Sequence, residues 1–382
     1  MKKITNQFTF NRNLLIPTGR VYGGQLVAQS IRAAKLFIDS EGLDDQSKLS
    51  GLVGGVTYIS TNFVTGGKLD QPVIYNCELV KVGKHYINLN ITASQASHSH
   101  ENGNPQSNAC HSHENGNLNS NQTILCQSVL TIATAIMVPE HTDGKDQYPD
   151  LHNPHSVPAT VPNATPTFSI EIPPYTKVPS SLETLGPLGA KIPPIQAWID
   201  TAVFAQHSVL PDVILAPVPL TKNSALLNNA DSCAHSKTVE NFIYAIPNEK
   251  FERVISKVIT SEYKTPNADD SSEKISNSDP LTISEFTHFA IDQAMLLPIF
   301  RAKELFLFDL SLRYTTMNHT ARMYAYPPIE IIKNGLFIHG KYESFAFNRG
   351  LATADIYTVT DDGLPGELFA KASQELYIKK KS

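Results

Sequence analysis

The chain shows the same order of secondary-structure signals twice: a helix-like segment followed by several strand-like segments. The first helix-like segment, 26–37, is mainly apolar and contains the small residues Ala28 and Ala33, which favours a helix packed closely on a flat surface. The second spans 282–300 and is also mainly apolar. Because one helix followed by antiparallel strands is typical of an α+β fold, we expect one structural plan in both halves.

Strand-like segments follow each helix, and several alternate apolar and polar residues, the period of a half-buried strand. Strands are predicted at 55–64, 72–80, 85–92 and 125–138 in the first half. In the second half they are predicted at 242–246, 254–259, 307–316, 351–359 and 368–378, with a strand pair at 336–347. These bounds place Thr316 at the end of a strand and Gln374 in the last strand.

A proline-rich stretch separates the two halves and is typical of a linker rather than of a core element. We therefore expect an N-terminal domain (1–140), a linker (141–195) and a C-terminal domain (196–382). The N-terminal domain carries a polar insertion, 96–122, in which a His-Ser-His-Glu-Asn-Gly-Asn motif occurs twice. Its histidines could bind zinc or copper, but we interpret the insertion as a solvated loop and predict no metal site.

Composition argues against several classes of partner. Charged residues make up 18% of the 382 residues, the formal net charge is −5, and no basic stripe indicates nucleic acid. The sequence contains no run of about 18 apolar residues, so we expect no membrane span. No apolar segment follows the first lysines, so we do not expect a secretory signal. The four cysteines show no metal-type spacing, which suits a compartment where thiols stay free.

Three polar residues near the C-terminus form the candidate catalytic set: Asp292, Thr316 and Gln374. A carboxylate, a hydroxyl and a carboxamide can hold and polarise one water molecule, with the carboxylate as general base. Each residue also has a structural interpretation: Asp292 as a salt-bridged acid, Thr316 as an ordinary strand residue, and Gln374 as an exposed polar residue. His319, close to Thr316, is interpreted as a supporting or structural histidine.

Two glycines, Gly23 and Gly24, lie at the start of the first predicted helix. Without side chains they allow a ligand or another backbone to approach closely. A tight turn before a buried helix is the alternative interpretation.

Residues 21–30, which contain these glycines, resemble the N-terminal helix motif of the acyl-CoA thioesterase II family, which includes bacterial thioesterase II and the peroxisomal acyl-CoA thioesterases. The resemblance continues at 63–83, 316–319, 349–351 and 373–375, whereas about 140–280 is not matched. It implies a double hotdog, in which two antiparallel sheets each wrap round a long central helix.

The resemblance also implies roles for individual residues and for the whole chain. Fatty acyl-CoA would be the substrate, no cofactor would be needed, and the protein would be a homo-oligomer. The compartment would be the peroxisome, or otherwise the cytoplasm, although the C-terminal Lys-Ser does not match the Ser-Lys-Leu type of address. The family's catalytic residues fall on Asp292, Thr316 and Gln374, and its substrate-binding positions on Gly23, Gly24 and Arg349.

Several residues depart from the family pattern. Asn318 replaces the usual aspartate, Arg322 lies where aromatic residues are usual, and Leu89 and Asn90 stand where arginines are expected. These changes could reshape the acyl pocket or the contacts with CoA.

The sequence therefore predicts a hydrolase that cleaves fatty acyl-CoA to fatty acid and CoA by direct attack of water. One alternative is a catalytically weak acyl-CoA-binding paralogue. Another is a hotdog enoyl-CoA hydratase, since His288 lies one turn before Asp292. A third is a scaffold protein whose histidine-rich loop binds metal.

Overall fold

The structure is a computed structural model that describes the core elements of both halves. The structure describes residues 4–10, 20–41, 55–68, 70–83, 85–97, 122–133, 281–305, 311–360 and 365–380. Residues 280 and 330 and three short strands are described as backbone only. The repeated histidine motif, the linker 141–195 and the predicted strand 254–259 lie outside these residues.

The first half combines one buried helix with long antiparallel strands. Its elements are β1 (Thr5–Phe10), α1 (Gly23–Ser40), β2 (Val56–Phe63), β3 (Val73–Val82), β4 (Tyr86–Ala96) and β5 (Gln122–Ala133). Almost every residue of α1 from Gly24 to Ile38 is buried, as expected for a helix rich in alanine and apolar residues that packs on a sheet. The helix predicted at 26–37 and the four predicted strands of this half are thus confirmed, with shifted ends.

The second half repeats this order after three short strands, β6 (Ile214–Pro217), β7 (Val239–Ala245) and β8 (Tyr263–Lys264). The predicted helix 282–300 is divided into two, because Pro298 has no N–H to donate to the carbonyl of Ala294, where the first piece ends. The elements are α7 (Pro280–Ala294), α8 (Leu296–Ala302), β9 (Leu312–Met323), α9 (Ile329–Ile332), β10 (Leu336–Ala346), β11 (Arg349–Val359) and β12 (Pro365–Lys380).

The strands form one antiparallel sheet and not the two separate sheets that we expected. Within the described residues, this sheet has twelve strands in the order β6-β7-β10-β11-β12-β9-β2-β5-β4-β3-β1-β8. The join lies between β2 and β9, each of which would be the edge strand of its own half. Pairing them satisfies backbone N–H and C=O groups that an edge strand leaves unpaired.

The two halves keep a common register about this join. β2 and β9 pair antiparallel, with the pair Ser60–Thr320 at the centre. Each strand has a one-residue bulge at the same distance from this centre, Thr57 in β2 against β5 and Met317 in β9 against β12. Residues of the two halves can therefore be compared position by position.

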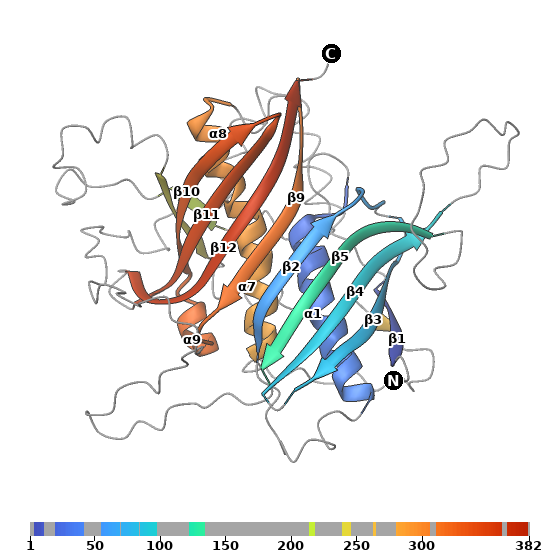
Figure 1. The fold of residues 1–382 in the computed structure, drawn as a ribbon. Helices are drawn as coiled ribbons and strands as arrows, with labels where there is room; N and C mark the ends of the chain where they lie inside the picture. Colours follow the sequence, from blue (N-terminus) through green and yellow to red (C-terminus); the bar gives the residue numbers. More distant parts are fainter. Residues whose placement is uncertain are drawn as a thin grey trace, which may run out of the picture.

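Both long helices cover the same face of the sheet, where they lie side by side (Figure 1). Gly24 contacts Asp292, and Arg32, farther along α1, contacts Glu285, nearer the start of α7, so the two helices run antiparallel. Arg32 and Glu285 form a buried two-point ion pair, with Nε–Oε1 at 2.8 Å and Nη2–Oε2 at 2.9 Å. None of the described helices is long and apolar enough to cross a bilayer.

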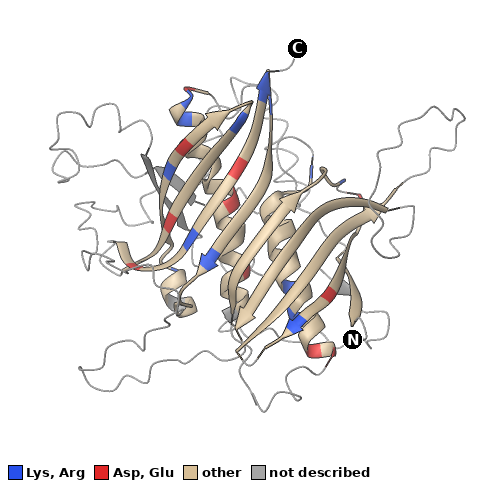
Figure 2. Cartoon of the chain, viewed as in Figure 1, with Lys and Arg blue, Asp and Glu red and all other residues tan. Residues whose placement is uncertain are grey.

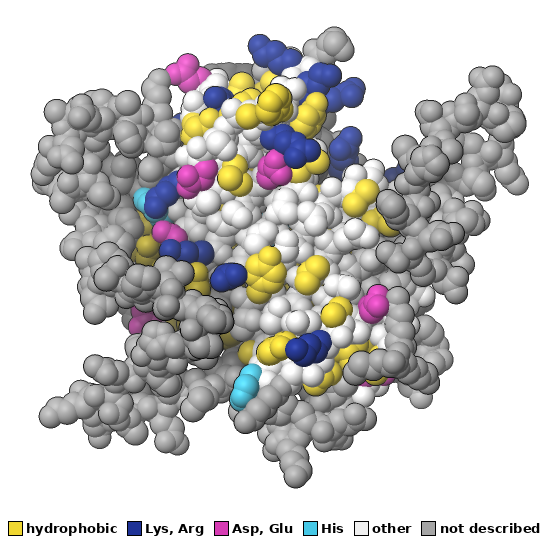
Figure 3. Space-filling model, in the orientation of Figure 1, with side chains coloured by type: hydrophobic (Ala, Val, Ile, Leu, Met, Phe, Trp, Pro, Cys, Tyr) yellow, Lys and Arg dark blue, Asp and Glu magenta, His cyan; other side chains and the backbone are white. Residues whose placement is uncertain are grey.

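The outer face of the sheet is polar near the join, although it carries few charges there. β2, β4 and β5 contain no charged residue, whereas β9 to β12 carry several (Figure 2). In the space-filling view the middle of this face is mostly uncharged, with scattered apolar side chains (Figure 3). Val129 of β5 is about half exposed.

Candidate active site

The carboxylate of Asp292 lies between the two long helices, in the last turn of α7 and opposite the start of α1. Its Oδ2 accepts a hydrogen bond of 2.8 Å from the backbone N–H of Gly24. Its Oδ1 accepts one of 3.2 Å from the hydroxyl of Thr316. The side chain is only 4% exposed, and no described cation pairs with it, so the interpretation of Asp292 as a salt-bridged acid is not supported.

Burial and hydrogen bonding act in opposite directions on the pKa of Asp292. Desolvation raises the pKa, and the hydrogen bonds with Gly24, Thr316 and Gln374 lower it. Desolvation is the larger effect, so the pKa rises from 3.8 to about 6. A carboxylate with this pKa is ionised at neutral pH and is a stronger base than an exposed aspartate, as a general base requires.

Thr316 lies inside β9 and not at the end of a strand, as we had expected. The strand continues to Met323 because it is held between β12 and β2. Met317 is the extra residue of the bulge, so Thr316 and His319 both face the helices although an uninterrupted strand would place them on opposite faces. The bulge therefore directs two polar side chains toward α7.

Gln374, on β12, is fully buried rather than exposed, and its amide joins the other two residues. Its Nε2 donates to the backbone carbonyl of Asp292 at 3.2 Å and to the hydroxyl of Thr316 at 3.2 Å. Both amide N–H groups are thus used, which fixes Thr316 as the donor to Asp292. The structure brings all three predicted catalytic residues into one hydrogen-bonded cluster.

The paired glycines allow α1 to approach this cluster closely. A Cβ on Gly24 would come within 2.7 Å of the Tyr22 ring and 2.8 Å of the carbonyl oxygen of Phe289, so only glycine fits. A Cβ on Gly23 would lie 3.0 Å from Asp292 Oδ2. The hydroxyl of Tyr22 also donates to the carbonyl of Phe289 at 2.7 Å, which holds the start of α1 on α7.

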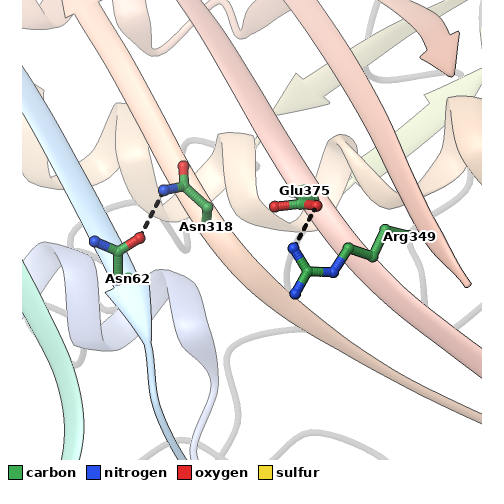
Figure 4. A network of polar contacts seen from close by, with 4 residues as sticks. All are labelled: Asn62, Asn318, Arg349 and Glu375. Carbon is green, nitrogen blue, oxygen red and sulfur yellow. Dashed lines mark hydrogen bonds and ion pairs between the residues drawn. The ribbon is translucent and has the colours of Figure 1, made fainter. Parts of the chain in front are cut away.

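Arg349, by contrast, is not brought to the cluster. It lies on the outer face of the sheet, where it pairs with Glu375 at 3.4 Å and is about half exposed (Figure 4). Gln374, one residue earlier on β12, faces the helices. A role of Arg349 in binding substrate would have to be exerted from the outer face.

The departures from the family pattern also lie away from the cluster. Asn318 is on the outer face and donates to Asn62 across the join at 2.8 Å (Figure 4). Arg322 stacks over the ring of Tyr58 on the same face, with 5.6 Å from its guanidinium carbon to the ring centroid. Leu89 is buried in the first half and its neighbour Asn90 is exposed. Among the described residues, none of the four forms a hydrogen bond or an ion pair with Asp292.

Two buried histidines extend the cluster, and the sequence did not indicate that they would meet. His288 Nδ1 lies 3.2 Å from His319 Nε2, and His319 Nδ1 lies 3.3 Å from Gln374 Oε1. The sequence showed that His288 precedes Asp292 by one turn and that His319 lies close to Thr316, but not that the two histidines are in contact. Within the described part of the chain, no group of three or more His, Cys, Asp or Glu side chains could hold a metal ion.

The first half has apolar residues at the positions that are polar in the second. By the common register, the counterparts of Thr316, His319 and Gln374 are Val56, Ile59 and Leu130. All three counterparts are fully buried. The fold therefore does not require polar side chains at these positions. This favours a functional reason for the polar cluster over a structural one.

Comparison with known proteins gives structural neighbours but no match in sequence. No family model and no curated protein matches the chain. Solved structures similar to it include a tesB protein from Mycobacterium avium subs paratuberculosis, at 12% identity and a TM-score of 0.48, with 98% of this chain and 93% of that chain covered. The acyl-CoA thioesterase II TesB2 from Mycobacterium marinum is similar at 13% identity and a TM-score of 0.47, covering 94% and 90%.

A third similar structure is a conserved protein of unknown function with a hot dog fold from Alicyclobacillus acidocaldarius. It has 10% identity and a TM-score of 0.46, with 100% of this chain and 94% of that chain covered. The structural neighbours thus include thioesterase II proteins, the family that the sequence motifs resemble. Identities this low leave the activity to be argued from the site itself.

Proposed function

We propose that the protein is a hotdog-type hydrolase, with two similar halves joined in one sheet, that cleaves fatty acyl-CoA thioesters to fatty acid and CoA by direct attack of water. The observation that carries this proposal is the buried Asp292 carboxylate, which accepts from Thr316 and from Gly24 at the start of α1 and has a pKa raised to about 6. Gln374 donates to the Thr316 hydroxyl and to the backbone carbonyl of Asp292. Apolar residues at the corresponding positions of the first half support a functional role for the cluster.

Asp292 would act as the general base. A water molecule beside its carboxylate gives up a proton to Asp292 while its oxygen attacks the thioester carbonyl. Thr316 donates to Oδ1 and accepts from Gln374, so a lone pair of its hydroxyl remains to accept a second hydrogen bond from the water. When the C–S bond breaks, the proton on Asp292 is available to the departing CoA sulfur.

The start of α1 would stabilise the oxyanion that forms on the thioester carbonyl. The N–H of Gly23 has no acceptor among the described residues, and it lies at the positive end of an 18-residue helix. A backbone donor placed there is suited to a developing negative charge. The site would then combine a base from the second half with an oxyanion donor from the first.

The hydratase alternative is less well supported by the geometry. Enoyl-CoA hydration by a hotdog enzyme would pair an aspartate with a histidine at the reacting carbon. Here His288 is hydrogen-bonded to His319 and not to Asp292, although it precedes Asp292 by one turn.

The proposal is tested by thiol release from palmitoyl-CoA with purified wild-type protein and Asp292→Asn. We expect release by the wild type and a loss of about 10²–10⁴-fold in rate for the variant, the usual share of a general base. The rate of the wild type should also fall as the pH drops through about 6, where Asp292 takes up its proton.

Asp355→Asn is the matched control, because this aspartate is partly exposed and pairs with Lys371 on the outer face. It should keep the wild-type rate. Absence of thiol release from short, medium and long acyl-CoA, together with saturable binding, would favour the acyl-CoA-binding alternative instead.

A further inference from the structure

The two buried histidines next to Gln374 have no part in the chemistry described above. His319 is on β9 and His288 on α7, and both side chains are fully buried. Burying an imidazole is costly unless its polar atoms find partners. Their contacts with each other and with Gln374 therefore call for an explanation.

The orientation of the Gln374 amide follows from its neighbours. The atom that faces the backbone carbonyl of Asp292 at 3.2 Å must be a donor, since that carbonyl can only accept. This atom is therefore Nε2, and Oε1 is the atom that faces His319 at 3.3 Å. Because Oε1 can only accept, His319 must carry a proton on Nδ1.

The protonation of the second histidine follows in the same way. Burial lowers the pKa of His319 to about 4 and that of His288 well below its ordinary value, so both rings are neutral near pH 7. With its one proton on Nδ1, His319 accepts at Nε2, and His288 must donate to it from Nδ1. The remaining nitrogen of His288, Nε2, has no partner among the described residues.

We propose that His319 is a positioning residue that holds the Gln374 amide in the orientation needed by Thr316 and Asp292, and that His288 fixes the tautomer of His319. Each residue then donates a hydrogen bond to the next in the series His288, His319, Gln374, Thr316 and Asp292. If the amide turned over, Oε1 would face the Asp292 carbonyl and the Thr316 hydroxyl could donate to it instead of to the carboxylate. This proposal rests on the proposed function.

A purely structural role for His319 is argued against by the first half of the chain. Ile59 occupies the corresponding position and is also fully buried. An apolar residue therefore satisfies the fold at this position, and the same substitution gives a variant that should fold.

The kinetic test compares wild type, His319→Ile and His319→Asn on palmitoyl-CoA. His319→Ile removes the donor to Gln374, and we expect kcat to fall about tenfold with little change in KM, since one hydrogen bond to a reacting cluster is lost. His319→Asn keeps an N–H near the place of Nδ1 and should restore most of the loss. His339→Asn, at a buried histidine that pairs with Asp355 in the β10–β11 register, is the control and should not change kcat.

The tautomers are read directly from proton–nitrogen correlation spectra of protein labelled with ¹⁵N-histidine, assigned with the His288→Asn and His319→Asn variants. We expect both rings to be neutral with the proton on Nδ1. In His288→Leu we expect His319 to lose its preference for the tautomer protonated on Nδ1. This measurement does not depend on activity.

The outcomes separate the two proposals. A wild type without activity on any acyl-CoA would overturn the proposed function and, with it, the positioning role. An active wild type with an unchanged kcat in His319→Ile, or with His319 protonated on Nε2, would overturn the positioning role alone. The positioning role is supported if kcat falls in His319→Ile and is largely recovered in His319→Asn, and if His288 and His319 are both protonated on Nδ1.

Discussion

The environment of Asp292 is suited to a general base rather than to stabilising the fold. Its carboxylate is almost excluded from solvent, and the hydrogen bonds that it accepts offset only part of the cost of burying the charge. An aspartate placed for stability would be expected to have a lowered pKa. The raised pKa of Asp292 therefore favours a catalytic role at this residue.

This environment makes a prediction about stability and pH. The folded protein retains the Asp292 proton up to about pH 6, whereas the unfolded chain loses it near 3.8, so the contribution of Asp292 to stability falls as the pH rises between these values. The difference of about two pKa units between the folded and unfolded states corresponds to about 3 kcal/mol of folding free energy. Asp292→Asn should therefore raise the free energy of unfolding at pH 8 by up to about 3 kcal/mol, and the gain should shrink toward pH 4.5.

Urea unfolding of wild type and Asp292→Asn at the two pH values checks this prediction. A variant that is less stable than the wild type at pH 8 would indicate a structural acid and contradict the account of Asp292.

At the scale of elements, α1 and α7 are held together by the close contact at Gly24 and by the ion pair of Arg32 with Glu285. Both charged side chains are buried, with Arg32 4% exposed and Glu285 fully buried. A buried pair makes up for its desolvation only when both partners are present. The pair thus fixes the register of the two helices, and with it the distance between Gly24 and Asp292.

Removing one partner should be strongly destabilising. Glu285→Ala leaves the Arg32 guanidinium buried without this carboxylate, and we expect the free energy of unfolding to fall by about 3–5 kcal/mol. The double variant Arg32→Met/Glu285→Leu should recover most of this loss, because apolar groups can fill the same space. Denaturant unfolding of the three proteins measures both effects; a single variant as stable as the wild type would contradict a buried ion pair.

Much of the local structure could be predicted from the sequence, but the bulge in β9 could not. Apolar periodicity indicated α1 and the four following strands to within a few residues. Apart from Met317, residues 315–320 are polar and show no apolar alternation, and the strand was predicted to end at Thr316. Its continuation depends on pairing with β2 and β12, which are distant in sequence. The contact of Gly24 with Asp292 is likewise a result of tertiary packing alone.

At the scale of the whole molecule, two similar halves share one sheet but only the second has the polar cluster. The predicted double plan was correct in its repeated order of elements, whereas the predicted separation into two sheets was wrong. Sequence periodicity is set by neighbours along the chain and does not report whether two edge strands pair. The join places the start of α1 beside Asp292, so the candidate site draws on both halves.

Exchanging residues between corresponding positions tests this asymmetry. The triple variant Thr316→Val/His319→Ile/Gln374→Leu places in the second half the residues that the first half already buries. We expect it to fold, because apolar residues of similar size already occupy the corresponding buried positions of the first half, and to lose thiol release, because Asp292 and His288 lose hydrogen-bond partners. Thermal unfolding and the thiol assay measure the two effects.

The reverse exchange, Val56→Thr/Ile59→His/Leu130→Gln, is the matched control. It buries three polar side chains where no hydrogen-bond partners are arranged for them. The free energy of unfolding should therefore fall by about 1 kcal/mol or more for each of the three. Its thiol release, measured under conditions where it remains folded, should equal that of the wild type. A stable reverse variant together with an unfolded forward variant would contradict the view that the fold favours apolar residues at these three pairs of positions.

The central claim, that Asp292 activates water without forming a bond to the acyl group, is tested most directly by a single turnover in H₂¹⁸O. Excess enzyme is mixed with palmitoyl-CoA, and the fatty acid and the peptide containing Asp292 are analysed by mass spectrometry. Direct attack places ¹⁸O in the fatty acid in the first turnover and leaves Asp292 unlabelled. Unlabelled fatty acid with ¹⁸O in the Asp292 carboxylate would show an acyl-enzyme intermediate and contradict the account.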